Sequence, residues 1–262
     1  MSAPSYEALL STPSEPETKT VIELAETLVD DRLGPILRCV EGGTDPHPSL
    51  RRSFSTFIPQ TGFWSDDGYA SVDVTGGSGP TIVDAKIAAL GEAIERYSLS
   101  IHQLDELLQA PFESLSDAVS PLEITAFSKD QRDKRELTES TLRETPFYWT
   151  RATSLVTGEK PWVPAQAVYM PFDPVELIRS PNTSGAAAGL DYRTAADRAV
   201  SELVERECFL IGYLNRLSYP HVNLASVNNG WFDELRRVIE TDRRELYVLD
   251  GSLDQPYKTA IA

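Results

Sequence analysis

Residues 81–98 read TIVDAKIAALGEAIERYS and follow a glycine-rich turn, Thr75–Gly79, with the sequence TGGSG. Thr81 is followed three residues later by Asp84, a capping-box pattern that predicts the start of a helix. Apolar residues recur at helical spacing after this start and predict one apolar stripe, formed by Ile87, Leu90, Ile94, Tyr97 and Ile101. The stretch therefore predicts a glycine-rich turn that leads into an amphipathic helix.

The polar side of this helix carries the motif E-x-x-E-R. Glu92 and Glu95 lie three residues apart, so their carboxylates project from the same side of the helix, and Arg96 follows them. A single motif of this kind is usually a solvated helix face. The motif by itself therefore says little about function.

The same construction returns in SGAAAGLDYRTAADRAVSELVERE, residues 184–207. Seven pairs of residues are separated by the same 110 positions: Gly79 and Gly189, Thr81 and Asp191, Ala85 and Ala195, Ala89 and Ala199, Glu92 and Glu202, Glu95 and Glu205, Arg96 and Arg206. Solenoid repeats have shorter periods and more copies. The pattern instead favours an internal duplication that brings two helices face to face.

Four carboxylates brought together would repel one another unless cations lay between them. Oxygen ligands in that number suit Mg²⁺ or Ca²⁺, and Mg²⁺ usually arrives with phosphates. The two small-residue turns offer backbone N–H groups near a helix start, where phosphate oxygens bind well. The residues alone therefore predict a site for a nucleotide with Mg²⁺.

The paired regions GGSG…AALGEAIERYS and TSGAAAG…AVSELVERE resemble the two signature regions of the YcaO family, and YVLDGSL at residues 247–253 is similar to a later family segment. LVDDRLGPILRC, residues 28–39, is more similar to the branch that forms azoline rings in peptides. The resemblance covers the chain from about residue 28 onward. It implies an α+β fold with mixed or antiparallel sheets and two pseudo-symmetric signature helices.

The resemblance also implies ATP and Mg²⁺ as cofactors. By this resemblance four carboxylates would hold the metal, namely Glu92, Glu95, Glu202 and Glu205. Four other residues would contribute to the nucleotide site, namely Arg96, Arg206, Ser78 and Ser184. Ser78 stands where the family usually has lysine, and the turn Thr183–Gly185 replaces the usual S-N-G.

The implied activity is that of an ATP-dependent cyclodehydratase that forms thiazoline or oxazoline rings in a ribosomal precursor peptide. Its implied partners are that peptide, a leader-peptide-binding protein and a second copy of the chain in a homodimer. Thioamide formation by the same ATP chemistry and a non-catalytic docking scaffold remain alternatives. No general base is assigned. The family continues beyond the position of Ala262, so we expect a C-terminally truncated chain.

Composition limits the remaining choices. The net charge is −16 over 262 residues, which argues against electrostatic binding to bare nucleic acid or an anionic membrane. No apolar run approaches the length of a transmembrane helix, and we expect a cytoplasmic protein. Residues 1–18 are rich in Ser, Pro and Glu and predict a disordered tail, followed by one ATP-binding domain over 19–262.

Overall fold

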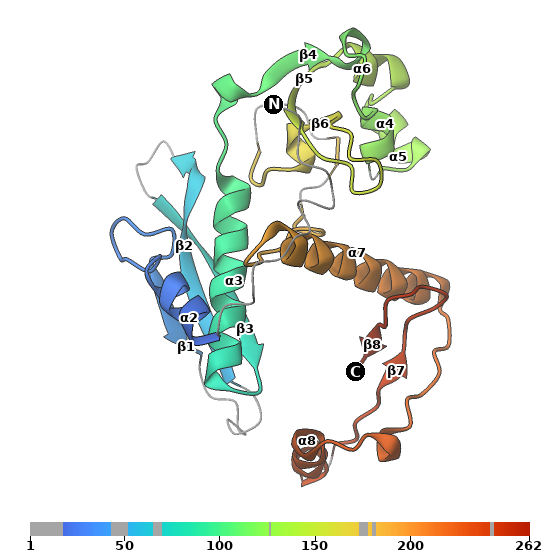
Figure 1. Ribbon diagram of the computed structural model, residues 1–262. Coiled ribbons are helices and arrows are strands. Elements are labelled where there is room, and N and C mark those ends of the chain that lie inside the picture. Colours follow the sequence, from blue (N-terminus) through green and yellow to red (C-terminus); the bar gives the residue numbers. More distant parts are fainter. Residues whose placement is uncertain are drawn as a thin grey trace. The chain divides into compact units, whose positions relative to one another are not determined.

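The computed structural model describes residues 18–42, 52–64, 70–125, 127–172, 178–179, 182–241 and 244–262. The predicted tail therefore falls almost wholly outside the described residues, and the domain boundary stays a prediction. The chain groups into two compact units, the first containing Ile58–Asp73 and Ile94–Thr183, the second containing Ser14–Phe57, Val74–Ala93 and Ser184–Ala262. Helices combine with small antiparallel sheets (Figure 1), which confirms the predicted α+β class.

The first unit is built on the antiparallel sheet β4–β5–β6 and three short helices that lie beside it (Figure 1). Its elements are β4 (Leu108–Pro111), α4 (Pro121–Ile124), α5 (Lys129–Lys134), α6 (Glu139–Glu144), β5 (Pro146–Arg151) and β6 (Trp162–Pro164). Phe147 and Trp149 alternate with more exposed residues along β5 and are buried. The Trp149 indole N–H donates to the carbonyl of Ala110 at 2.8 Å, so its polar edge is satisfied inside the core.

Each of the three short helices of this unit begins at a residue whose side chain caps it. Ser128 and Gln131 form a capping box at the start of α5, and the Thr138 hydroxyl accepts the Thr141 N–H before α6. Leu137 and Leu142 belong to the buried cluster around Phe147 and so anchor α5 and α6 to the core.

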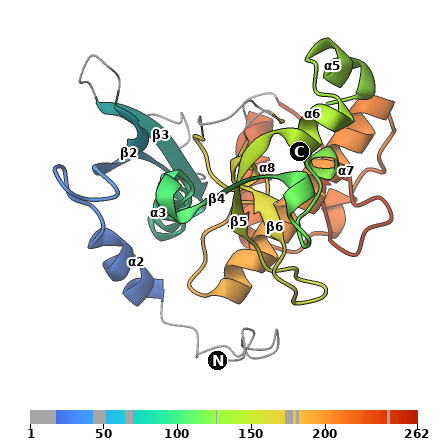
Figure 2. The same cartoon turned by 90° about the horizontal axis from the view of Figure 1, so that it is seen from above.

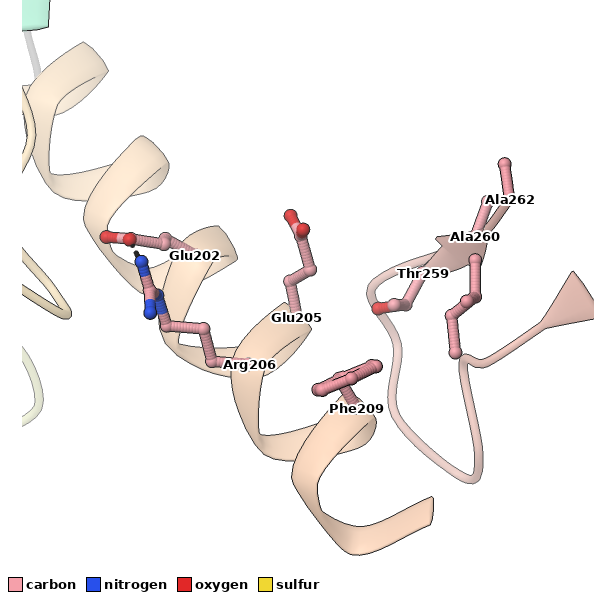
Figure 3. Close-up of a pocket in the computed structure, with 8 residues that line it drawn as sticks. Glu202, Glu205, Arg206, Phe209, Thr259, Ala260 and Ala262 are labelled. Atoms are coloured by element: carbon pink, nitrogen blue, oxygen red, sulfur yellow. Dashed lines mark hydrogen bonds and ion pairs between the residues drawn. The ribbon is translucent and has the colours of Figure 1, made fainter. Parts of the chain in front are cut away.

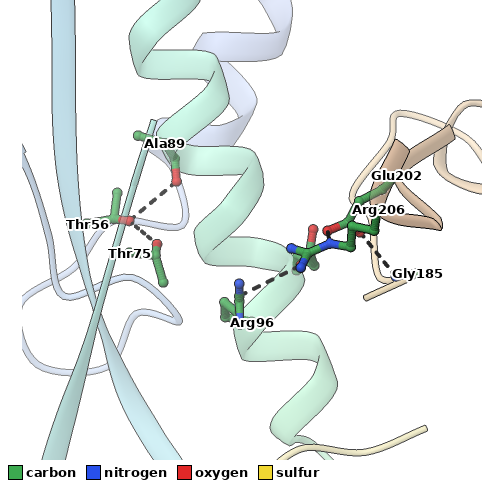
Figure 4. Close-up of polar contacts among 8 residues, drawn as sticks. Thr56, Thr75, Ala89, Arg96, Gly185, Glu202 and Arg206 are labelled. Carbon is green, nitrogen blue, oxygen red and sulfur yellow. Dashed lines mark hydrogen bonds and ion pairs between the residues drawn. The ribbon is translucent and has the colours of Figure 1, made fainter. Parts of the chain in front are cut away.

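The second unit begins with α2 (Thr18–Glu26), β1 (Arg38–Glu41) and parts of three longer elements, β2 (Arg52–Trp64), β3 (Ala70–Gly79) and α3 (Ile82–Ser100). The sheet order is β1–β2–β3, and α3 lies alongside β2 and β3 in both views (Figures 1 and 2). Thr56 is fully buried on this sheet. Its hydroxyl donates to the Ala89 carbonyl at 3.3 Å and lies 2.6 Å from the Thr75 hydroxyl, so Thr75 donates to it (Figure 4).

The buried face of α3 differs from the predicted stripe. Ala85, Ala89 and Ala93 are fully buried together with Leu90, whereas Ile101 is 48% exposed and follows the end of the helix. The reason is the close approach of β3. A Cβ atom on Gly77 would lie 2.1 Å from the Ala89 nitrogen, so only small residues fit between strand and helix. The TGGSG segment, predicted as a turn, is accordingly the last part of β3.

The two signature helices begin with the same local geometry. The Asp84 N–H donates to the Thr81 hydroxyl at 3.1 Å before α3. The Thr194 N–H donates to the Asp191 carboxylate at 2.7 Å before α7 (Tyr192–Asn215). These partners are separated by 110 positions, so the threonine and the aspartate have exchanged places between the two caps.

The glycines before the caps repeat this geometry. A Cβ on Gly79 would lie 2.8 Å from the Ala85 nitrogen, and one on Gly189 would lie 2.4 Å from the Ala195 nitrogen. Both glycines therefore pack on the first turn of their helix at a distance that excludes a side chain. The two copies share this glycine contact, the cap and the first helical turn, whereas the segment before the first helix is a strand.

The remaining elements of the second unit are α8 (Gly230–Thr241), β7 (Leu249–Asp250) and β8 (Ala260–Ile261), and β8 lies across a pocket from α7. Cys208 is buried, and its thiol lies 3.7 Å from the carbonyl of Ser252. Leu249 pairs with Ile261 in the antiparallel β7–β8 ribbon. None of the helices in the described residues is long and apolar enough to span a membrane.

We predict that Gly77→Ala lowers the free energy of unfolding by about 1–3 kcal/mol or more, because the new methyl group collides with backbone that cannot move aside. Gly91→Ala is the matched control, since nothing lies within 4 Å of its Cβ position in the interior of α3. That change should stabilise the protein by up to about 1 kcal/mol. Urea unfolding measures both, and equal effects would contradict the close strand–helix contact.

We also predict that the N-cap of α7 gives the stability a specific pH dependence. The Thr194 N–H and hydroxyl hold the pKa of the Asp191 carboxyl below its ordinary value. Because this pKa is lower in the folded than in the unfolded protein, the ionised Asp191 carboxylate stabilises the fold fully at neutral pH. The stabilisation is lost as the pH falls through the pKa of the folded state. The stability gap between wild type and Asp191→Asn should therefore narrow between neutral pH and about pH 3. A gap that stays constant would show that the charge of Asp191 contributes nothing.

Candidate functional site

A pocket of about 440 Å³ lies between α7 and β8 in the second unit. It is lined by Glu202, Glu205, Arg206 and Phe209 from the helix and by residues 259–262 from the strand and its approach. Figure 3 shows Glu205 and Phe209 pointing from α7 toward the strand, and the side chains of Glu202 and Arg206 lying beside each other. The charged residues of the second E-x-x-E-R motif therefore line a pocket.

Glu202 is fixed by two contacts from opposite directions. The Arg206 Nε–H donates to one carboxylate oxygen at 2.8 Å, one helical turn away. The backbone N–H of Gly185 donates to the other oxygen at 3.1 Å (Figure 4). Gly185 has a φ of +85°, a conformation that side-chain-bearing residues rarely adopt. The small-residue turn and the carboxylate of the second repeat are thus joined directly.

The residues predicted from the first repeat occupy α3 and β3. Glu92 is half-buried on α3, and the Arg96 Nε lies 3.7 Å from the Glu95 carboxylate. Ser78 is exposed near the end of β3. These residues do not line the pocket at α7, and their assignment to the nucleotide site stays a prediction. The same holds for Ser184, which precedes Gly185 in the second turn.

The predicted grouping of four carboxylates is not seen within the described part of the chain. No set of three or more His, Cys, Asp or Glu residues there is placed to hold a metal ion. The pocket still fits Mg²⁺ with a nucleotide, because Mg²⁺ is usually bound by one or two carboxylates together with phosphate oxygens. Glu202 and Glu205 would supply the carboxylates, and the Arg206 guanidinium is suited to phosphate.

A sequence model described as YcaO cyclodehydratase, ATP- and Mg²⁺-binding, matches residues 76–262. The chain belongs to the YcaO family. The match includes both signature helices and both turns, and it confirms ATP and Mg²⁺ as the ligands expected at family level.

Known relatives agree with this membership. An uncharacterized protein of Methanothermobacter thermautotrophicus is 28% identical over 202 residues, which cover 76% of this chain and 49% of that protein. A solved heterocyclase in complex with substrate and cofactor is 26% identical with a TM-score of 0.77, over 91% of this chain and 34% of that one. This YcaO chain thus spans about half the length of the curated relative and a third of the heterocyclase.

A third comparison bears on the fold. The structure of YcaO from Methanopyrus kandleri bound with AMPPCP and Mg²⁺ is 19% identical with a TM-score of 0.63, and the match covers 89% of this chain and 53% of that chain. At this level of identity the comparison shows a shared fold. It confirms the predicted YcaO-like α+β architecture.

The pocket contains residues that the sequence analysis did not single out. Phe209 lies four residues after Glu205 and therefore on the same side of α7, a spacing that could have indicated it. The sequence of residues 259–262 does not indicate that they line a pocket, because their position near α7 depends on the pairing of β8 with β7.

The sequence analysis also did not single out His102, which lies in the first unit just after α3. The Nδ1 atom of His102 is buried without a hydrogen-bond partner in the described structure. The centroid of the His102 ring lies 5.2 Å from the centroid of the Tyr169 ring and 5.0 Å from that of the Phe172 ring. Nothing in the sequence around His102 indicates this aromatic surrounding.

We predict that Gly185→Ala destabilises the protein more than Gly158→Ala. Both glycines have positive φ values, +85° and +73°, so both substitutions carry a backbone penalty of about 1–2 kcal/mol. Only at Gly185 does the new Cβ also meet a neighbour, 3.1 Å from a methyl group of Leu203 on α7. Urea unfolding of the two variants measures the difference. Equal losses would show that the turn does not pack against the helix.

Proposed function

We propose that this chain forms the nucleotide-binding part of an ATP- and Mg²⁺-dependent peptide cyclodehydratase. The observation that carries the proposal is Glu202, whose carboxylate is held between Arg206 and the Gly185 N–H at the wall of a pocket. A carboxylate oriented in this way is ready to bind a cation without first losing side-chain freedom. Membership of the YcaO family supports the same assignment.

The proposed reaction joins the side chain of a Cys, Ser or Thr residue to the preceding carbonyl carbon of a ribosomal precursor peptide. The carbonyl oxygen is lost, and a thiazoline or oxazoline ring results. When bound, ATP with Mg²⁺ would supply the phosphoryl group that makes this oxygen a leaving group. The similarity to a heterocyclase solved with substrate and cofactor supports this chemistry, and a leader-peptide-binding partner is part of the same proposal.

The chain's own residues would bind the Mg²⁺ and the nucleotide and orient them. Glu202 and Glu205 would hold the cation, and their negative charges would be neutralised by it. The Arg206 guanidinium, half-exposed beside Glu202, would place positive charge next to the phosphates. The Gly185 N–H would keep the Glu202 carboxylate in position while its other oxygen is engaged. Glu92, Glu95, Arg96, Ser78 and Ser184 would complete the site from the remaining signature segments.

The test is calorimetric binding of ATP with Mg²⁺ to wild type, Glu202→Gln, Glu92→Gln and Glu207→Gln. Removing one charge from a cation site should weaken binding about 10- to 100-fold in the first two variants, because hydrogen bonds and contacts to charged groups contribute about 1.5–3 kcal/mol. Glu207 is exposed on α7 and does not line the pocket, so its variant should bind as wild type does.

A thermal unfolding curve for each variant separates lost binding from lost folding. Wild-type affinity in Glu202→Gln with an intact fold would exclude this pocket as the cation site. Wild-type affinity in Glu92→Gln alone would show that the first repeat does not contribute a ligand.

A further inference from the structure

Thr259 stands on the wall of the pocket that faces α7, and its backbone is held there by buried neighbours. Its N–H donates to the Ser252 hydroxyl at 3.0 Å, and its carbonyl accepts the Gly251 N–H at 2.8 Å. Ser252 is itself buried, and its carbonyl accepts the Cys208 thiol of α7 at 3.7 Å. These contacts fix where the Thr259 side chain stands relative to the helix.

The Thr259 hydroxyl takes no part in these contacts. The residue is only 6% exposed, yet within the described part of the chain its hydroxyl makes no hydrogen bond. Figure 3 shows the side-chain oxygen of Thr259 turned toward α7, from which Glu205 points back across the pocket. Because a buried hydroxyl without a partner costs free energy, valine would fill the same space at lower cost. An almost fully buried polar side chain that is directed into a pocket indicates that a ligand binds there.

We propose that the Thr259 hydroxyl is a further ligand of the cation in this pocket, and that it binds the cation from the wall opposite Glu205. This inference rests on the proposed function, in which Glu202 and Glu205 hold Mg²⁺ with ATP. A hydroxyl combined with a carboxylate is a donor pair that nucleotide-binding proteins use for Mg²⁺. The hydroxyl oxygen is neutral, so it adds a ligand without adding to the repulsion between the two carboxylates.

A hydroxyl can also donate to a phosphate oxygen, so the choice between cation and phosphate depends on the neighbouring charges. Glu205 is negative, and it would repel a phosphate held opposite it but attract a cation. The guanidinium suited to phosphate belongs to Arg206, which is paired with Glu202. The space between Thr259 and Glu205 is therefore assigned to the cation.

The experiment titrates Mn²⁺ by itself into wild type, Thr259→Val, Thr259→Ser and Glu202→Gln, and follows the free ion by EPR. Mn²⁺ prefers the same oxygen ligands as Mg²⁺. Wild type and Thr259→Ser should bind Mn²⁺ with equal affinity, because both keep the hydroxyl. Thr259→Val keeps nearly the same shape without the hydroxyl and should bind Mn²⁺ about tenfold more weakly, since one ligand is lost. Calorimetry with ATP and Mg²⁺ should show the same order of affinities.

Thermal unfolding without metal or nucleotide separates binding from folding. The hydroxyl has no partner among the described residues, so Thr259→Val should unfold at the wild-type temperature or above it. A lower unfolding temperature would give the hydroxyl a structural role and overturn the assignment.

The remaining outcomes distinguish the role of Thr259 from the proposed function. Wild-type affinity for Mn²⁺ in Thr259→Val, or equal losses in Thr259→Val and Thr259→Ser, would overturn the role of Thr259, while a loss in Glu202→Gln would still support the proposed function. Weaker binding of ATP with Mg²⁺ in Thr259→Val, with unchanged binding of Mn²⁺, would assign the hydroxyl to a phosphate oxygen instead. A wild type that binds ATP with Mg²⁺ but no Mn²⁺ by itself would also overturn the cation ligand. A wild type that binds neither would refute both proposals.

Discussion

The structure depends on one steric constraint, the contact between a glycine-containing segment and the backbone of the helix that follows it. Gly79 packs on the Ala85 nitrogen and Gly189 on the Ala195 nitrogen, and in both places a side chain would overlap the helix. Because the approach is set by backbone against backbone, it fixes where each helix starts. The hydrogen bonds from Asp84 to Thr81 and from Thr194 to Asp191 then fix its first turn. Every position along the helix, including the motif E-x-x-E-R, is placed relative to this contact.

The two copies of the motif have different surroundings. In the second copy, Glu202 accepts hydrogen bonds from Gly185 and Arg206, and α7 faces the β7–β8 ribbon across a pocket. In the first copy, the alanines of α3 pack on the sheet, and Thr56 ties that sheet to the helix backbone. A duplicated sequence thus gives one helix held by a sheet and another that lines a pocket. The difference arises because the sheet that packs on α3 precedes that helix in the chain, whereas the β7–β8 ribbon that faces α7 follows it.

The chemistry of the pocket requires few ligands from the protein. Mg²⁺ keeps an octahedral shell that phosphate oxygens and water can largely complete, so the proposed site would need only a few carboxylates from the protein. Glu202, Glu205 and Phe209 share one side of α7, and this side passes from charged to aromatic within two turns.

The sequence by itself determined the duplication, the family, the two helices and the α+β class. It could do so because caps, glycines and E-x-x-E-R depend on residues close in the chain, where spacing translates directly into geometry. The sequence misjudged the buried face of α3, since isoleucine and tyrosine satisfy the apolar pattern while only alanine fits beneath Gly77. Tertiary structure alone decided that residues 259–262 face Phe209, because that depends on the pairing of Leu249 with Ile261 and on Cys208 packing against Ser252. The contact between Cys208 and Ser252 joins residues 44 positions apart, and no local pattern records it.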